Sequence, residues 1–142
     1  MATSSYVGID VSKDRLDVAV LGEKQERQVC NTQAGIAKLV QWMLELQPEL
    51  IVVEATGGYQ RAVVDALFHA GLGVAVMNPA RVRQFARACG LLAKTDKLDA
   101  QVLAVFGQRV QPKRYEGKSE AEKQLSALLT RRKQVEEMLK AE

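Results

Sequence analysis

The chain has 142 residues, 47% of them hydrophobic, which suffices for one packed domain with an appendage. The sequence contains no run of about 18 apolar residues that could span a bilayer. Residues 1–6 are too short and polar for a secretory signal, so we expect a cytoplasmic protein without membrane contact. The two cysteines, Cys30 and Cys89, lack metal-ligand spacing, and the net charge of +3 favours a polyanionic partner only weakly.

Three short strands are predicted at the start of the chain. Residues 6–11 alternate between apolar and small or polar side chains, as a half-buried strand does, and this strand carries Asp10. The alternation resumes over residues 16–20, and a third strand is predicted at 27–30. Close succession of such strands indicates an antiparallel meander.

A helix and a buried strand follow the meander. Asn31 or Thr32 is predicted to cap the helix, which ends before Pro48. The continuous apolar run at 50–53 then indicates a strand covered on both faces, and Glu54 ends it. Glu54 is therefore expected at the end of a strand.

The second half of the chain contains a further strand between helices. Helices are predicted at 59–70, 80–89, 95–109 and 119–141, with a strand at 74–77. A meander followed by strands with helical crossovers predicts an α/β fold, a mixed sheet flanked by helices, and an RNase H-like sheet is one of the few permitted topologies. We assign residues 1–110 to this domain and 111–142 to a linker and a coiled-coil helix. The predicted heptad seam of this helix contains Ala121, Leu125, Leu128, Arg132, Val135 and Leu139.

Four carboxylates come from three of these elements. Asp10 lies on a strand, Glu54 ends a strand, and Asp96 and Asp99 are predicted to share one helical face, about 5–6 Å apart at Cβ. If they converge, they repel each other unless cations are present, and hard oxygen ligands suit Mg²⁺, with Mn²⁺ as a substitute. Two such ions would stabilise the attacking and leaving oxygens of a phosphodiester displacement. Taken singly, each acid also has an ordinary interpretation, such as a turn residue for Asp10 or a helix N-terminal charge for Asp96 and Asp99.

Four short segments stand out together in chain order: Gly8-Ile-Asp10-Val-Ser12-Lys13, Glu54-Ala-Thr-Gly-Gly-Tyr59, Asn78-Pro79 and Lys94-Thr-Asp96-Lys-Leu-Asp99-Ala100. In this order the chain resembles the DEDD transposases of the IS one-ten insertion-sequence family, a group that includes the pilin-gene invertase Piv. The resemblance runs from about Tyr6 through the C-terminal helix.

The resemblance implies a RuvC-like domain in which Asp10, Glu54, Asp96 and Asp99 bind Mg²⁺ and carry out catalysis. It implies a recombinase that cleaves and transfers DNA strands during transposition. It also implies a structured guide RNA and a homo-oligomer, a dimer or a tetramer, held by the coiled coil. In the family a second transposase domain supplies a nucleophilic serine. Because the sequence stops within the coiled-coil helix, we expect that domain to be absent and full strand exchange to be incomplete.

Candidate nucleic-acid contacts lie in two places. Residues 80–95 contain four cations and no acid before Asp96, and Lys and Arg side chains bind phosphate without regard to sequence. Thr56 and Gly57 precede a predicted helix and could offer backbone amides to phosphate. A solvated helix face and a plain turn are the alternatives. The four cations are Arg81, Arg83, Arg87 and Lys94.

Two other classes of function stay open at this stage. The Gly8-Ile-Asp10 strand also resembles the first phosphate motif of actin-like, ATP-dependent sugar kinases, although such kinases need two domains and have no role for Asp96 and Asp99. The heptad seam and the basic stretches would alternatively fit a noncatalytic oligomerisation or nucleic-acid-binding module. Nucleotide binding would favour the first alternative, and failure to bind Mg²⁺ or Mn²⁺ the second.

Overall fold

The centre of the fold is a mixed sheet of five strands. The computed structural model describes residues 5–93, 98–117 and 120–140. The strand order is β3-β2-β1-β4-β5. β1 pairs antiparallel with β2 and β2 with β3, whereas β1, β4 and β5 are parallel to one another, which confirms the predicted meander and crossovers. The strands are β1 (Tyr6–Val11), β2 (Arg15–Val20), β3 (Arg27–Cys30), β4 (Leu50–Glu54) and β5 (Val74–Met77).

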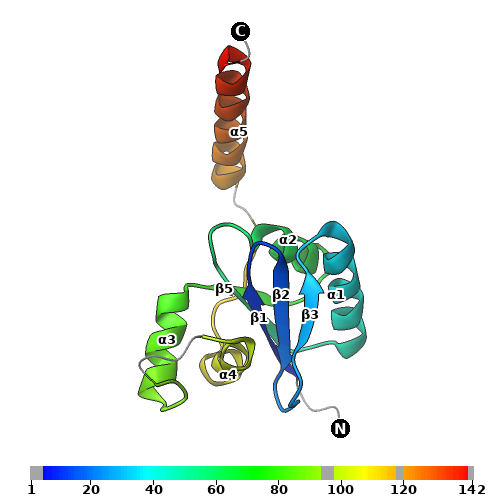
Figure 1. Cartoon of the computed structure of the whole chain (residues 1–142), viewed down its shortest axis with the longest axis vertical. Coiled ribbons are helices and arrows are strands. Elements are labelled where there is room, and N and C mark those ends of the chain that lie inside the picture. The colour runs from blue at the N-terminus through cyan, green and yellow to red at the C-terminus, as the bar shows by residue number, and fades with distance from the viewer. Residues whose placement is uncertain (1–4, 94–97, 118–119, 141–142) are drawn as a thin grey trace.

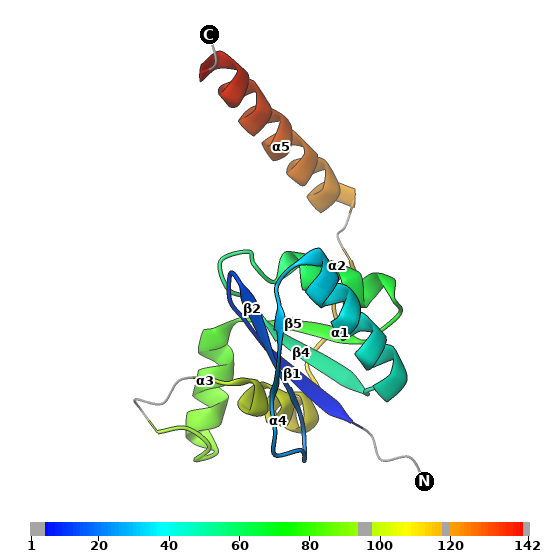
Figure 2. The same cartoon turned by 45° about the vertical axis from the view of Figure 1, so that its right-hand side comes forward.

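Two helices cover each face of the sheet (Figures 1 and 2). On one face, α1 (Gln33–Leu46) and α2 (Arg61–His69) pack on the odd-numbered residues of β1 and β4. On the other, α3 (Pro79–Ala88) and α4 (Ala100–Val110) pack on the even-numbered residues of β4. Strand β4 is buried on both faces, as its continuous apolar sequence predicts.

Helix α4 lies directly against β1 because β1 has a glycine at the contact. A Cβ atom on Gly8 would collide with the carbonyl oxygen of Ala100 and would lie 2.7 Å from the amide nitrogen of Ala104. A glycine within a strand often marks such a close backbone approach. The first turn of α4 therefore begins beside the strand that carries Asp10.

The start of α4 differs from the sequence-based prediction. A helix from residue 95 was expected to place Asp96 and Asp99 on one helical face, but the helix begins at Ala100 and Asp99 is its extended N-cap. The Asp99 Oδ1 atom accepts a hydrogen bond from the Val102 amide at 2.9 Å, which favours this start because it satisfies a free donor of the first turn. The prediction that Asp96 and Asp99 share one helical face is therefore wrong. Asp96 itself lies outside the described residues.

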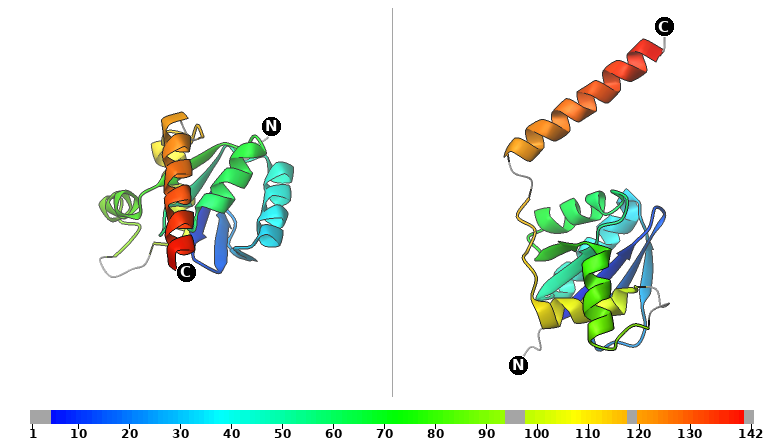
Figure 3. Two further views of the ribbon diagram at one scale, coloured as in Figure 1. Left: turned by 90° about the horizontal axis from the view of Figure 1, so that it is seen from above. Right: turned by 90° about the vertical axis from the view of Figure 1, so that its left-hand side faces the viewer.

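Helix α5 (Glu120–Lys140) extends away from the sheet (Figure 3). Its large apolar residues are exposed, which suits a helix that pairs with another helix, and the coiled coil stays a prediction. Within the described residues, none of the helices combines the length and apolar character needed to cross a membrane. The exposed residues are Leu125, Leu128, Leu129, Val135, Met138 and Leu139.

Candidate metal centre

Asp10 and Glu54 lie side by side at the ends of two parallel strands. Gly8 pairs with Val52 and Ile9 with Val53, so one further step along both strands brings Asp10 beside Glu54. Both side chains lie on the sheet face that α4 covers, because side chains alternate between faces along a strand. Glu54 is only 8% exposed, so a charged residue is held at the edge of the core.

The surroundings of Asp10 disfavour its negative charge. Burial raises the pKa of Asp10 to about 7, and a hydrogen bond with Glu54 and repulsion from Glu54, Asp17 and Asp99 act in the same direction. A nearby carboxylate disfavours the charged form of Asp10, because like charges repel. The pair would gain from a nearby positive charge.

Asp99 reaches this pair from the start of α4. Its charge contributes to the raised pKa of Asp10, and its role as N-cap fixes its position on the backbone. Three of the four predicted acids, Asp10, Glu54 and Asp99, are thus neighbours. Among the described residues, which do not include Asp96, no three His, Cys, Asp or Glu side chains form a group that could hold a metal ion.

Two further acids, not identified from the sequence, adjoin this group. Asp17 on β2 is the direct partner of Asp10 in the antiparallel register. Burial raises the pKa of Glu26, and the charges of Asp99 and Asp17 raise it further. The loop that carries Glu26 is tied to α4, because the Gln101 side-chain amide donates to the Glu23 carbonyl at 2.9 Å. Strand pairing was the available signal for Asp17, because a short turn sets residues 10 and 17 opposite each other.

The residues present fit a hard divalent cation. Within the described part of the chain, two buried side-chain oxygens have no hydrogen-bond partner: Asp17 Oδ1 and Thr56 Oγ1. Buried polar atoms are otherwise almost always paired, so such atoms call for an explanation. Carboxylate and hydroxyl oxygens are hard donors of the kind that Mg²⁺ and Mn²⁺ bind.

The loops that follow β1 and β4 are held together by Asn31. Its side-chain amide donates to the Ser12 carbonyl at 2.9 Å and to the Tyr59 carbonyl at 3.1 Å. The adjacent Thr32 is the N-cap of α1, so of the two predicted candidates the structure selects Thr32. Asn31 therefore fixes the loops that leave Asp10 and Glu54.

The candidate phosphate loop follows Glu54. The Thr56 amide donates to Gln60 Oε1 at 3.1 Å, so this amide is already engaged within the protein. Gly57 is exposed and has a φ of 58°, in the region that favours glycine. Phosphate contact at Gly57 stays a prediction.

The candidate basic surface lies on α3. Arg81, Arg83 and Arg87 are all exposed there, whereas Lys94 lies outside the described residues. Arg81 also sits 5.8 Å from the centre of the Phe106 ring of α4, a cation–π distance. Arg81 lines a pocket of about 390 Å³ whose other cations are Lys113 and Arg114. Positive charge thus collects on α3 and beside the edge strand β5.

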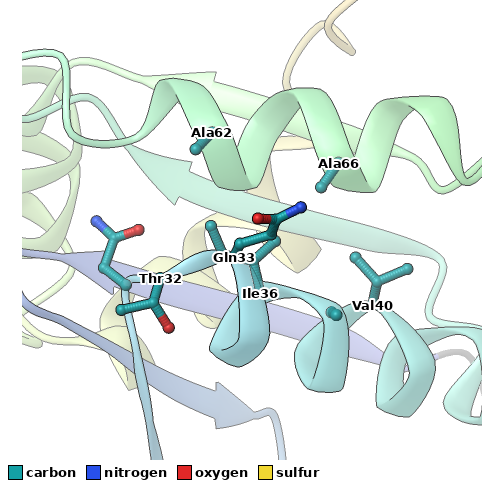
Figure 4. A pocket seen from close by; sticks show the side chains of 8 residues that line it. Thr32, Gln33, Ile36, Val40, Ala62 and Ala66 are labelled. Carbon is teal, nitrogen blue, oxygen red and sulfur yellow. The ribbon is translucent and has the colours of Figure 1, made fainter.

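A larger pocket lies on the opposite face. Between α1 and α2, a pocket of about 520 Å³ is lined chiefly by apolar side chains, among them Ile36, Val40 and Ala66 (Figure 4). No acidic or basic side chain lines it. It therefore has no part in the acidic site, which lies beneath α4.

Comparison with solved structures identifies the class of fold. RuvC of Thermus thermophilus in complex with a Holliday junction substrate aligns with a TM-score of 0.53 and 18% identity, over 76% of this chain and 96% of RuvC. A second Thermus thermophilus RuvC structure aligns with a TM-score of 0.51 and 18% identity, over 78% of this chain and 99% of that one. The fold is RuvC-like, and the predicted RNase H-like sheet is confirmed.

Sequence comparison identifies the family. The model of the IS one-ten (IS110) DEDD family, described as Transposase, matches residues 7–142, and the chain belongs to this family. The pilin gene-inverting proteins of Moraxella lacunata and Moraxella bovis are each 29% identical over 136 residues, which are 92% of this chain and 42% of each relative. The chain thus spans less than half the length of these relatives. Family membership favours the recombinase interpretation over the kinase and noncatalytic alternatives.

Proposed function

We propose that this chain forms the divalent-metal centre of a DNA recombinase, which cleaves and transfers phosphodiester strands during transposition. The observation that supports the proposal is the adjacency of Asp10 and Glu54 at the ends of two paired strands of a RuvC-like sheet, with the charge of Asp99 acting on Asp10. The RuvC relative in the fold comparison holds a Holliday junction, and the sequence relatives are named for inverting a gene. Both point to DNA as the substrate.

Each acid contributes in a different way. Glu54 is held rigidly at the end of a buried strand, Asp99 is fixed by its capping hydrogen bond, and Asp10 joins them across β1. We assign Asp96 to the same set from the family motif. Bound Mg²⁺ or Mn²⁺ would neutralise these carboxylates, activate the attacking hydroxyl group and stabilise the leaving oxygen. The tight contact of α4 with β1 fixes the start of α4, and with it Asp99, beside the strand that carries Asp10.

The proposal includes the association of several chains with one another and with RNA. The exposed apolar residues of α5 support a homo-oligomer, a dimer or a tetramer, held by a coiled coil. A guide RNA from the mobile element would supply target choice, as the family resemblance implies. The nucleophilic serine belongs to the second domain of the family.

A metal titration tests the centre directly. With Mg²⁺ or Mn²⁺ added, we expect the melting temperature of the wild-type chain to rise by several degrees, because a ligand that binds only the folded state stabilises it. Asp10→Ala should not respond. Asp14→Ala, which alters an exposed acid in the neighbouring turn, should respond like the wild type. Equal responses of the wild type and Asp10→Ala would contradict the proposed centre.

The α3 surface predicts salt-sensitive DNA binding. In the double variant Arg83→Ala/Arg87→Ala, we expect weaker binding of a four-way DNA junction. The slope of the logarithm of the binding constant against the logarithm of the salt concentration should become shallower by about 0.9 for each lost phosphate contact. Fluorescence anisotropy at several salt concentrations measures both quantities. Lys38→Ala, which removes an exposed cation from α1 on the other face of the sheet, is the control. If the double variant and Lys38→Ala bind alike, α3 is not the DNA surface.

A further inference from the structure

The antiparallel hairpin of β1 and β2 carries an acid outside the family quartet. We infer that Asp17 is a fifth carboxylate of the metal centre, a positioning residue that holds the cation's bound water beside Asp10. This inference rests on the proposed function, because it assigns a role toward the same cation.

Strand register places Asp17 at the site. Asp10 and Asp17 are directly opposed, one step beyond the pair Ile9 and Val18. Directly opposed residues of antiparallel strands project on the same face, with Cβ atoms about 4.5–5.5 Å apart. Two steps away, Gly8 pairs with Ala19, and this face is the one against which α4 packs. Asp17 therefore lies on the face that holds Asp10, Glu54 and Asp99.

The position of Asp17 is costly for a residue with only a structural role. The residue is half-buried, and its Oδ1 atom is buried and has no hydrogen-bond partner among the described residues. A like charge directly across the strand pair destabilises the fold further. A buried polar atom without a partner destabilises the folded state. A cation with its bound water would remove both penalties.

The other acids of the site leave room for a further carboxylate that accepts hydrogen bonds from water bound to the cation. One oxygen of Asp99 is engaged by the Val102 amide. Mg²⁺ commonly retains several of its waters in proteins, and outer acceptors of this kind orient the inner ligands. Strand β2 lies between β1 and β3 in the sheet, so Asp17 lies on the β3 side of Asp10.

Calorimetry on the intact chain tests this role. Mn²⁺ affinity is measured by isothermal titration at pH 8, and the melting temperature by scanning calorimetry in EDTA, for the wild type, Asp17→Asn, Asp10→Asn and Asp14→Asn. We expect Asp17→Asn to bind Mn²⁺ about 10–100-fold more weakly, as outer partners of metal sites do when changed. In EDTA it should melt at a higher temperature than the wild type, because one of two opposed charges is gone. Asp14→Asn should match the wild type in both measurements.

A weaker Mn²⁺ affinity together with a higher melting temperature in EDTA distinguishes a role in metal binding from a role in stabilising the fold. A structural role for Asp17 predicts a lower melting temperature and unchanged Mn²⁺ affinity, and unchanged affinity overturns the inference. If Asp17→Asn does not fold, Asp17→Ser carries the same comparison. If the wild type itself fails to bind Mn²⁺, the proposed centre fails as well. If Asp10→Asn loses binding while Asp17→Asn keeps it, the centre stands and only the role of Asp17 is rejected.

Discussion

Gly8→Ala is expected to lower the free energy of unfolding by about 3 kcal/mol and to abolish stabilisation by Mn²⁺. The added Cβ would meet the backbone of α4 at Ala100 and Ala104, and backbone atoms cannot rotate away as a side chain can. Overpacking of a well-packed core typically costs about 1–3 kcal/mol, and this contact lies at the upper end. Displacement of α4 would also carry Asp99 away from Asp10. Urea unfolding, with and without Mn²⁺, measures both effects.

Gly73→Ala is the matched control for this change. Its added Cβ would also be crowded, but by the guanidinium end of Arg114 at 2.9 Å, which is flexible and exposed. We expect its cost to stay below about 1 kcal/mol and its response to Mn²⁺ to be unchanged. If Gly8→Ala were as stable as Gly73→Ala and still responded to Mn²⁺, the close approach of α4 to β1 would be contradicted.

In EDTA, the free energy of unfolding should fall as the pH rises from about 4 to 7. The pKa of Asp10 is about 7 in the folded chain, against an ordinary value of 3.8, so the folded state binds the proton more tightly than the unfolded state does. The stabilisation is complete below the ordinary value and is lost as the pH passes the folded value. Because Asp10 is only partly buried, solvent screening limits the fall, which we expect to be about 1–2 kcal/mol.

Glu54→Gln tests how much the neighbouring acid adds to the effect of burial on this pH dependence. It removes the charge that repels Asp10, so we expect a shallower fall between pH 4 and 7. Glu45→Gln, an exposed change on α1, should keep the wild-type slope. Urea unfolding at half-unit pH steps in EDTA provides the comparison. A slope in Glu54→Gln as steep as that of the wild type would show that the pair is not the source.

Local patterns in the sequence were sufficient for much of the fold. Alternation over β1 and β2 and the apolar run of β4 predicted the strands that carry Asp10 and Glu54, because strand burial follows directly from side-chain periodicity. Helices α2 and α3 agree with the prediction to within two residues at each end. The position of Glu54 at a buried strand end likewise followed from its neighbours.

The remaining features depend on contacts that no local pattern contains. Thr95 and Asp99 are both capable N-cap residues, so periodicity alone placed the helix start too early, whereas the cap at Asp99 depends on how α4 meets β1. Asp17 was missed because a polar residue alternating with apolar ones usually faces solvent. Its burial arises from α4, which is distant in the sequence. The proximity of Asp10 to Glu54 likewise depends on the pairing of β1 with β4, which are far apart in the sequence.

The exposed apolar residues of α5 imply that the chain contains two parts with different folding behaviour. In the proposed coiled coil a partner helix covers Leu125, Leu128 and their neighbours, and helices in proteins draw most of their stability from such packing. Folding of α5 is then coupled to association, and its helix content depends on protein concentration. The sheet domain, which has its own buried core, is free of that dependence. Dilution would unfold α5 and leave the sheet domain intact.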